Sequence, residues 1–242
     1  MLIKPLNDIR KVVKTVRNDG IRRTAQLIAE TISARLHDRF DQKHGVETSR
    51  YVKLSRLGFD SEDQRLSRDY SASPVRTLRA LLRRLGHDLA CATFVDFGSG
   101  KGRALLVASE FGFQHIVGVE FSHELHRIAE RNLHSYRGRK QRCVALSSMC
   151  IRAEEFVLPE GELVLYFYNP FEPEIMERVL SNVADAWQKS PRRIYLLFIR
   201  MRFRPVVARL SMFREIEIGR LPFDPARPSG YDAAIFVADQ KL

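Results

Sequence analysis

The sequence predicts an α/β protein with a doubly wound, mostly parallel, seven-stranded sheet and an N-terminal helical extension. Two observations predict this fold class. From Thr93 onward, short apolar segments alternate with segments of helical periodicity, which is typical of strands and helices that wind around a parallel sheet. The last two apolar segments follow one another without a helical segment between them, so we expect an antiparallel edge there.

Length, composition and cysteine content favour an ordinary globular protein. The chain has 242 residues, of which 45% are hydrophobic and 29% charged. Its longest apolar runs, such as 194–199, are far shorter than the roughly 18 residues that a membrane span needs, and no secretory signal follows Met1. The three cysteines form no Cys-x-x-Cys pair, which argues against a disulfide framework and a zinc site. We therefore expect a cytoplasmic protein without a metal site.

The first 69 residues are expected to form the helical extension, and 70–242 the domain that carries the ligand site. Up to about position 45, apolar residues recur at helical spacing, and Gly45 supplies a stop signal. Residues 46–69 are polar and lack clear periodicity, which predicts a loop. The apolar residues of the helical repeat are Ile21, Ala25, Ile28, Ile32 and Leu36.

The elements of the domain are predicted one by one from periodicity and capping. Pro74 suits the first turn of a helix that we expect to run to about Leu85. Ser122 suits the N-cap of another helix. Two further helices are expected over 101–111 and 173–187. The segments expected as strands are 94–97, 116–119, 144–150, 163–168, 194–199, 213–218 and 233–237.

A glycine-rich turn lies between the first expected strand and the helix after it. Gly98, Gly100 and Gly102 let the backbone approach a ligand closely, because glycine has no Cβ atom. The N–H groups at the helix start favour polar or anionic ligand groups. Glu120 ends the next strand, 18 residues after Gly102, where a carboxylate accepts hydrogen bonds from ribose hydroxyls. Together these residues predict a site for an adenosine-containing ligand.

The details of this turn separate the kinds of adenosine ligand. Dinucleotide-binding turns follow the pattern Gly-x-Gly-x-x-Gly or Gly-x-Gly-x-x-Ala, whereas Arg103 occupies the position of the third small residue here. This difference disfavours NAD. The turn also lacks the Gly-Lys-Ser/Thr ending of a phosphate-binding P-loop. A cofactor without a pyrophosphate, next to the acidic Asp96, fits the pattern better.

With these segments, the chain resembles the class I methyltransferases that use S-adenosylmethionine (AdoMet), over roughly Tyr70 to the C-terminus. More narrowly, it is similar to a bacterial group with FVDFGSGKGR, GVEFS and LYxYNPF segments. The resemblance implies AdoMet as the cofactor and methyl transfer as the activity. The residues that it implies for cofactor binding are Asp96, Gly98, Ser99, Gly100, Gly102, Glu120 and Phe121.

The resemblance also implies an adenine contact just after the third strand and a lid before the first helix of the domain. Many class I members have an Asp at the adenine position, where this chain has Arg152, so Glu154 or a backbone group would take its place. Tyr70, Ser71 and Ser73 lie where these enzymes often fold a lid over the cofactor. The alternative for these three residues is an N-cap with a packing tyrosine.

Asn169, Pro170 and Phe171, at the end of the fourth strand, are the expected catalytic residues. The segment resembles the (Asn/Asp)-Pro-Pro-(Tyr/Phe) motif of amino-methyltransferases, but it has one proline, and Glu172 replaces the aromatic residue. It is also similar to the Asn-x-Phe segment of the histone lysine methyltransferases related to the telomeric-silencing disruptor. Both similarities point to a nitrogen acceptor. The alternative is that Asn169 caps the strand-to-helix turn and Phe171 belongs to the core.

The net charge of +11 is concentrated at the two ends of the chain. Residues 1–50 carry 11 basic and 6 acidic side chains (+5), 191–242 carry 10 and 5 (+5), and 141–190 carry 4 and 8 (−4). A basic surface can attract nucleic acid, anionic lipid or an acidic protein, and the alternative is a solvated basic surface without a partner. Three functions stay open: a methyltransferase with an unidentified acceptor, a protein-lysine or nucleic-acid methyltransferase in particular, and a non-enzymatic AdoMet-binding module whose basic N-terminal helices bind a partner.

Overall fold

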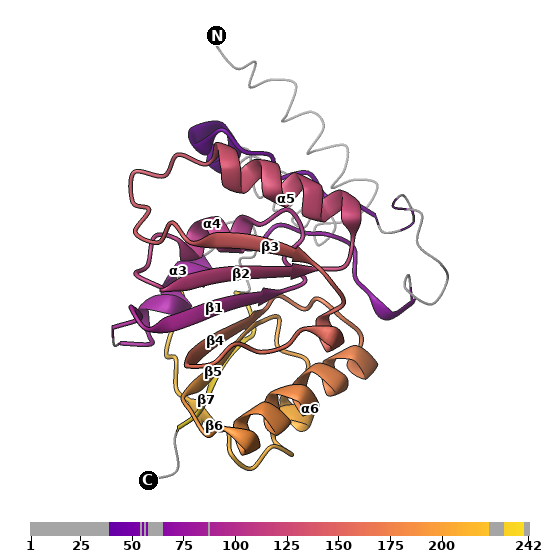
Figure 1. Ribbon diagram of the computed structural model, residues 1–242, viewed down its shortest axis with the longest axis vertical. Coiled ribbons are helices and arrows are strands. Elements are labelled where there is room, and N and C mark those ends of the chain that lie inside the picture. The colour runs from indigo at the N-terminus through magenta and orange to yellow at the C-terminus, as the bar shows by residue number, and fades with distance from the viewer. Residues whose placement is uncertain are drawn as a thin grey trace, which may run out of the picture.

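The computed structural model describes residues 39–53, 55, 57, 65–86, 88–222 and 230–239. These residues contain one seven-stranded sheet in the order β3-β2-β1-β4-β5-β7-β6 (Figure 1). The predicted fold class is therefore confirmed. The helices expected within 1–38 lie outside the described residues. The described part of the extension is helical over 39–44 and turns at Gly45, which has a φ of 67°.

The sheet is parallel except at one strand. β1 to β5 pair in parallel, whereas β7 runs antiparallel to both β5 and β6, as expected for the final strand pair. The strands are β1 (Ala92–Phe97), β2 (His115–Glu120), β3 (Leu146–Cys150), β4 (Glu162–Phe167), β5 (Ile194–Ile199), β6 (Arg214–Ile216) and β7 (Ala233–Ala238).

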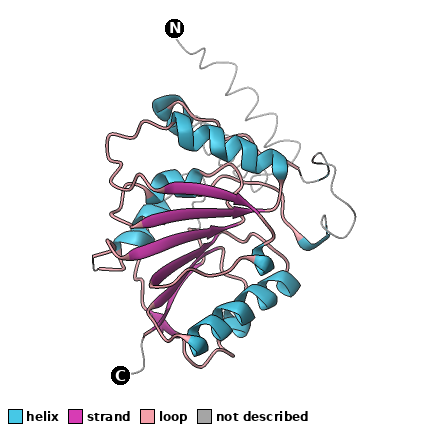
Figure 2. Ribbon diagram, viewed as in Figure 1, coloured by secondary structure: helices cyan, strands magenta, loops and turns pink. Residues whose placement is uncertain are grey.

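Helices cover both faces of the sheet, as Figures 1 and 2 show. One face carries α3, α4 and α5, and the other carries η2, α6 and α7. No helix among the described residues is long and apolar enough to cross a membrane. The helices are α3 (Val75–Arg83), α4 (Arg103–Ala108), α5 (His123–Ser135), η2 (Ala153–Glu155), α6 (Pro173–Lys189) and α7 (Arg204–Val207).

Several element boundaries differ from the predicted ones for local reasons. α4 begins two residues later than expected, because Gly102 has a left-handed φ of 83° and stands at the N-cap. Pro74 is likewise the N-cap of α3 and not its first helical residue. The N-cap predicted for α5 is confirmed, since the Ser122 hydroxyl accepts a hydrogen bond from the Leu125 N–H at 3.3 Å. α7 and η2 were not predicted, because helices of 4 and 3 residues are too short to show apolar periodicity.

Aromatic side chains hold the centre of the sheet together on the α6 face. The rings of Phe97, Phe167 and Phe198 stack across β1, β4 and β5 with centroid distances of 5.1 and 4.9 Å. Phe236 on β7 continues this row edge-on at 6.1 Å. Stacked and edge-on rings add to the stabilisation from burial alone. The row therefore fixes the order of the four central strands, on which the position of any site at their carboxyl ends depends.

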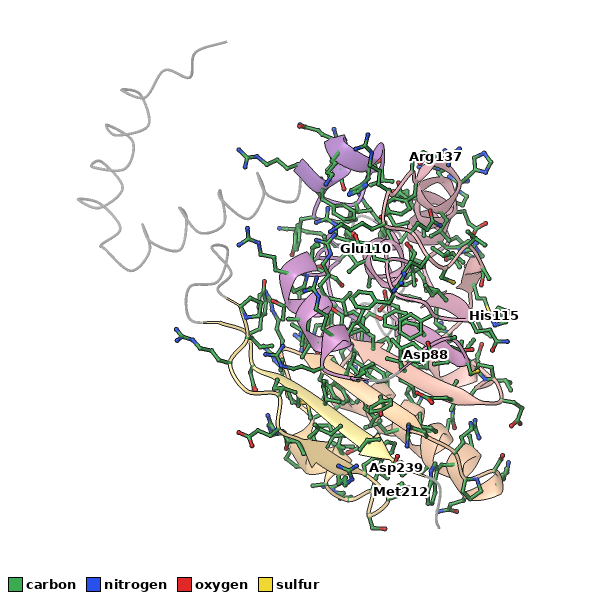
Figure 3. The ribbon with its side chains drawn as sticks, turned by 90° about the vertical axis from the view of Figure 1, so that its left-hand side faces the viewer. Asp88, Glu110, His115, Arg137, Met212 and Asp239 are labelled. Atoms are coloured by element: carbon green, nitrogen blue, oxygen red, sulfur yellow. The ribbon has the colours of Figure 1, made fainter. Side chains whose placement is uncertain are left out.

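The long axis of the molecule runs across the strands. In Figure 3, Arg137 lies at one end, beyond α5, and Met212 and Asp239 lie at the opposite end beside β6 and β7. Asp239 accepts hydrogen bonds there from Arg193 at 2.9 Å and Arg214 at 3.1 Å. All three side chains are substantially exposed, so these ion pairs contribute little to stability.

Arg103 joins the described part of the extension to the domain. Its side chain is 1% exposed, and its guanidinium contacts the Asp41 carboxylate at 3.0 Å and the Thr48 hydroxyl at 2.5 Å. Burial alone would raise the pKa of Asp41, but hydrogen bonds from Ser49 and Thr48 and the charge of Arg103 hold it below its ordinary value. The guanidinium also stacks over the Phe40 ring at 5.0 Å. A small residue at position 103 could not make these contacts with Asp41, Thr48 and Phe40.

Lys101 and Asn132 make a second set of contacts with the same segment. The Lys101 ammonium lies 2.9 Å from the Glu47 carboxylate, and its side chain is 2% exposed. The Asn132 carboxamide accepts from the Glu47 N–H at 2.8 Å and donates to the carbonyls of Glu47 and Lys101 at 2.9 Å. Residues 39–53 therefore pack directly on the glycine turn. The division between 69 and 70 stays a prediction.

We predict that Arg103→Met strongly destabilises the protein. The substitution keeps an apolar stem but leaves the buried Asp41 carboxylate without its cation, which typically costs about 3–5 kcal/mol. Urea unfolding of the full chain measures this loss. The control is Arg204→Met, because Arg204 and Glu215 form an exposed pair that contributes roughly 0–1 kcal/mol. Equal free energies of unfolding for the two variants would refute the anchoring role of Arg103.

Candidate functional site

The site lies at the carboxyl ends of the neighbouring strands β1 and β4, from which the chain continues in opposite directions along the sheet. β1 lies between β2 and β4, and the strand order reverses between β1 and β4. At such a point a crevice opens outside the carboxyl ends of the strands, and ligands bind there. The glycine turn follows β1, and Asn169 follows β4. The fold therefore brings together two segments that the sequence analysis identified separately.

The glycine turn adopts a conformation that favours glycine. Gly98, Gly100 and Gly102 have φ values of 75°, 55° and 83°, in the left-handed region. The N–H groups of Gly98 and Ser99 both donate to the Val119 carbonyl, at 2.9 and 3.0 Å, so the turn is attached to β2. A Cβ atom at Gly98 would lie 2.6 Å from Cβ of Pro170, and one at Gly100 would lie 2.3 Å from the Tyr70 ring. Neither position has room for a side chain.

Gly118, a position that the sequence analysis did not single out, makes this attachment sterically feasible. It lies within β2, beside the turn, and a Cβ atom there would lie 2.7 Å from the Ser99 hydroxyl oxygen and 2.7 Å from Leu105. An isolated glycine inside an apolar strand often marks the close approach of another segment. This signal could have identified Gly118 from the sequence.

Glu120 is held rigidly beside the turn. Its side chain is buried, and its two carboxylate oxygens accept hydrogen bonds from the N–H groups of Gly100 and Ser122, both at 2.8 Å. Burial raises the pKa of Glu120 to about 7, although hydrogen bonds from these two N–H groups and from the Phe121 N–H act in the opposite direction. The position at the carboxyl end of β2 is the one that the sequence predicts for a ribose contact.

Asp96 places a second buried carboxyl group near Glu120. Burial, together with the charge of Glu120, raises the pKa of Asp96 well above its ordinary value. Within the described part of the chain, no hydrogen bond or ion pair reaches the Asp96 carboxylate, and the buried Ser99 hydroxyl also lacks a partner. Two neighbouring carboxyl groups without a compensating cation favour a ligand that carries positive charge.

Asn169 has an unusual backbone and a side-chain oxygen without a partner. Its φ is 47°, in the left-handed region that non-glycine residues rarely adopt. Its carboxamide oxygen is buried and accepts no hydrogen bond from any described residue. The next residue, Pro170, packs on Gly98, and Phe171 is 7% exposed within the core on the α6 face. Phe171 packs in this core and also lines the cavities at the crevice, so its part in the reaction stays a prediction, and Asn169 keeps an acceptor available there.

Two adjoining cavities occupy the crevice. The smaller, of about 290 Å³, lies beside the residues that follow β3, and the larger, of about 400 Å³, lies beside the glycine turn and Asn169. They share Ser67, Gly98, Phe121 and Phe171 as lining residues. All predicted cofactor and catalytic residues line one or both cavities except Asp96 and Gly102.

The smaller cavity contains the positions expected to contact adenine. Ile151, Arg152, Ala153 and Glu154 all line it. The Ile151 N–H donates to the Glu120 carbonyl at 3.1 Å, which fixes this loop to the end of β2. Arg152 and Glu154 are thus both positioned beside a ligand in this cavity, and the substitution of Arg for the common Asp does not close it.

A segment that begins in the predicted loop of 46–69 and continues through the predicted lid residues crosses the site. Residues 65–73, which we call the strap, form an antiparallel bridge between Ser67 and Phe171. The Glu172 N–H donates to the Leu66 carbonyl at 3.0 Å, and the Glu172 carboxylate pairs with Arg68 at 2.8 Å. At position 172, where the amino-methyltransferase motif has an aromatic residue, this chain thus has a carboxylate that binds the strap.

Tyr70, Ser71 and Ser73, the residues expected as a lid, belong to the strap and line the larger cavity. The Tyr70 ring lies over Gly100, and its hydroxyl donates to the Thr48 carbonyl at 2.6 Å. Tyr70 therefore touches the extension and the glycine turn together. Among the residues that the structure describes, no group of three His, Cys, Asp or Glu side chains could hold a metal ion.

No protein-family model matches the sequence, and no curated protein matches it. Several solved structures are similar in part. Magnesium protoporphyrin IX methyltransferase from Synechocystis PCC 6803, with bound SAM, is 15% identical with a TM-score of 0.47, over 69% of this chain and 78% of that chain. An RNA methyltransferase from Salinibacter ruber, in complex with S-adenosyl-L-homocysteine, is 16% identical with a TM-score of 0.45, over 70% and 95%. An rRNA methylase from Streptococcus thermophilus is 9% identical with a TM-score of 0.43, over 68% and 93%. Similarity at this level assigns no family to the chain.

Proposed function

We propose that this protein is an AdoMet-dependent methyltransferase that transfers the methyl group to a nitrogen atom. The observation that carries the proposal is the arrangement at the switch point of the sheet. Two buried carboxyl groups, Asp96 and Glu120, flank a glycine turn on one side. On the other side, Asn169 lines the same cavity with a carboxamide oxygen that has no partner among the described residues.

The residues of the crevice fit AdoMet in charge and shape. The larger cavity adjoins the turn, whose positive φ values and close packing admit only glycine. The Glu120 carboxylate accepts backbone N–H groups from Gly100, Ser122 and Phe121, and an ionised carboxylate has about four acceptor sites, so one stays available for a ribose hydroxyl. Burial and Glu120 raise the pKa of Asp96, and a positively charged ligand would favour its ionised form, which would then compensate the charge of the ligand. The smaller cavity, after β3, would hold the adenine.

AdoMet supplies an activated methyl group on a sulfonium sulfur. The protein's task is then to hold the acceptor nitrogen in line with that group, and such positioning can contribute roughly 7–11 kcal/mol to the reduction of a barrier. Asn169 suits this task, because its carboxamide oxygen can accept an N–H of the acceptor and so direct the nitrogen lone pair. The nitrogen would form its new bond to the methyl carbon as the carbon–sulfur bond breaks with its electron pair going to sulfur. S-adenosylhomocysteine would leave, and the nitrogen would release a proton to solvent.

We predict that Glu120→Gln weakens AdoMet binding about 10- to 100-fold, because hydrogen bonds to a charged group contribute roughly 1.5–3 kcal/mol. In the native protein, affinity should rise as the pH increases through about 7, since Glu120 must lose its proton to keep an acceptor site for a ribose hydroxyl beside its backbone N–H donors. The variant should show no such rise. Isothermal titration with AdoMet from pH 5.5 to 8.5 measures both effects.

The matched control for this experiment is Glu130→Gln, an exposed carboxylate on α5. It should leave both the affinity and its pH dependence unchanged. Native-like affinity in Glu120→Gln would remove Glu120 from the cofactor site. A folded native protein that binds no AdoMet at any pH would overturn the proposed function.

We predict that Asn169→Ala lowers the rate of methyl transfer by roughly a hundredfold, the size of effect expected when a positioning contact is lost. AdoMet affinity should be retained, because the group that is removed orients the acceptor. Incorporation of labelled methyl from AdoMet into a cell extract measures the rate. Gln114→Ala, an exposed amide at the opposite end of β2, is the control.

Two outcomes of this assay count against the proposal. Full transfer by Asn169→Ala would exclude the residue from the reaction. A native protein that binds AdoMet but labels nothing in the extract would favour the non-enzymatic binding module.

A further inference from the structure

Two arginines line the larger cavity on the side away from the cofactor residues. Arg200 follows β5 directly, and Arg202 is two residues further along. In the parallel register that pairs Phe167 with Phe198, Asn169 and Arg200 are each two residues beyond the paired positions. Arg200 therefore stands beside Asn169 at the carboxyl edge of the sheet.

Arg200 lies on the acceptor side of the site. Three strand spacings separate β2, which ends at Glu120, from β5 in the order β2-β1-β4-β5. At about 4.8 Å for each spacing, the two residues are roughly 14 Å apart across the sheet. Asn169, at the end of β4, lies between them. A cofactor whose ribose binds Glu120 and whose reactive end reaches Asn169 leaves Arg200 to the molecule that receives the methyl group.

The backbone of Arg200 is held in an unfavourable conformation. Its φ is 61°, and among the described residues only Asn169 and Arg200 combine a side chain with a positive φ. Residues kept in such conformations cluster at ligand-binding and active sites, where the surrounding structure holds them. Both belong to the same cavity, at the ends of neighbouring strands. Among the described residues, the left-handed backbone conformations of non-glycine residues thus occur only at the crevice.

The Arg200 guanidinium is held in place, but no described residue neutralises its charge. It stacks over the Tyr168 ring at 5.3 Å, and its buried Nε–H has no hydrogen-bond partner among the described residues. Within the described ranges, neither Arg200 nor Arg202 forms an ion pair. The other charged groups that line this cavity are already engaged. Arg68 pairs with Glu172, and Arg103 with Asp41. Asp69 accepts a hydrogen bond from the Tyr51 hydroxyl, and Glu120 accepts backbone N–H groups. A planar guanidinium with free donors matches a carboxylate or a phosphate.

We propose that Arg200, assisted by Arg202, binds an anionic group, a carboxylate or a phosphate, on the methyl acceptor. The inference rests on the proposed function and specifies its substrate class: an acceptor with a negative charge on one side of the reacting nitrogen. Asn169 directs the nitrogen, and Arg200 fixes the molecule that carries it. The cavity of about 400 Å³ thus divides between the cofactor and an acidic acceptor.

The test is a titration of the protein, saturated with S-adenosylhomocysteine, with inorganic phosphate and with benzoate, followed by NMR at constant ionic strength. Benzylamine serves as the cationic counterpart of benzoate. We expect saturable binding of at least one anion, none of benzylamine, and about tenfold weaker anion binding in Arg200→Gln. Preference for phosphate or for benzoate identifies the source of the charge.

The controls separate this inference from the proposed function. Arg209→Gln removes an arginine whose side chain is 72% exposed and should leave anion binding unchanged. Arg200→Gly replaces Arg200→Gln if the latter fails to fold, because glycine adopts the φ of 61° without strain. Both Arg200 variants should retain native affinity for S-adenosylhomocysteine.

Three results would overturn the inference: no anion binds, anion binding is the same in the Arg200 variants, or these variants lose affinity for S-adenosylhomocysteine. The last result would assign Arg200 to the cofactor and leave the proposed function intact. Failure of the native protein to bind S-adenosylhomocysteine would instead overturn the proposed function. Anion titration of the unliganded chain would still decide whether Arg200 is an anion site.

Discussion

The hydrogen bonds between the glycine turn and the end of β2 are the constraint on which the site depends. Gly98 and Ser99 donate to a β2 carbonyl, and Gly100 donates to the Glu120 carboxylate. The turn and the carboxylate are therefore parts of one hydrogen-bonded unit built on two neighbouring strands. Gly118 makes this unit sterically feasible, because any side chain there would displace the turn. The other site residues are arranged around it.

The strap and the extension close this unit from outside. Glu172 binds Arg68 of the strap, and Arg103 binds Asp41 of the extension. The amino-methyltransferase motif has an aromatic residue at position 172, and dinucleotide-binding turns have a small residue at position 103. This chain has a charged residue at both positions. Both departures thus have one physical cause, because each supplies a charge that attaches a preceding segment to the ligand-binding domain.

Local patterns predicted the sheet, the glycine turn and the position of Glu120, because strand and helix periodicity are local and parallel strands bring their carboxyl ends to one edge. The contact of Arg103 with Asp41 was not predictable, since it joins residues 62 positions apart with no shared pattern. Arg200 was missed for another reason. A left-handed conformation leaves no trace in the sequence when the residue is an arginine, whereas a glycine would have indicated it.

Tyr70 gives the site a thermodynamic link to the extension. Its ring covers Gly100, and its hydroxyl is bonded to the Thr48 carbonyl. A ligand that is bound more tightly when Tyr70 is in place also stabilises the docked extension, and by reciprocity a molecule that draws residues 39–53 away weakens ligand binding by the same factor. The occupancy of the crevice and the docking of residues 39–53 are therefore coupled through Tyr70.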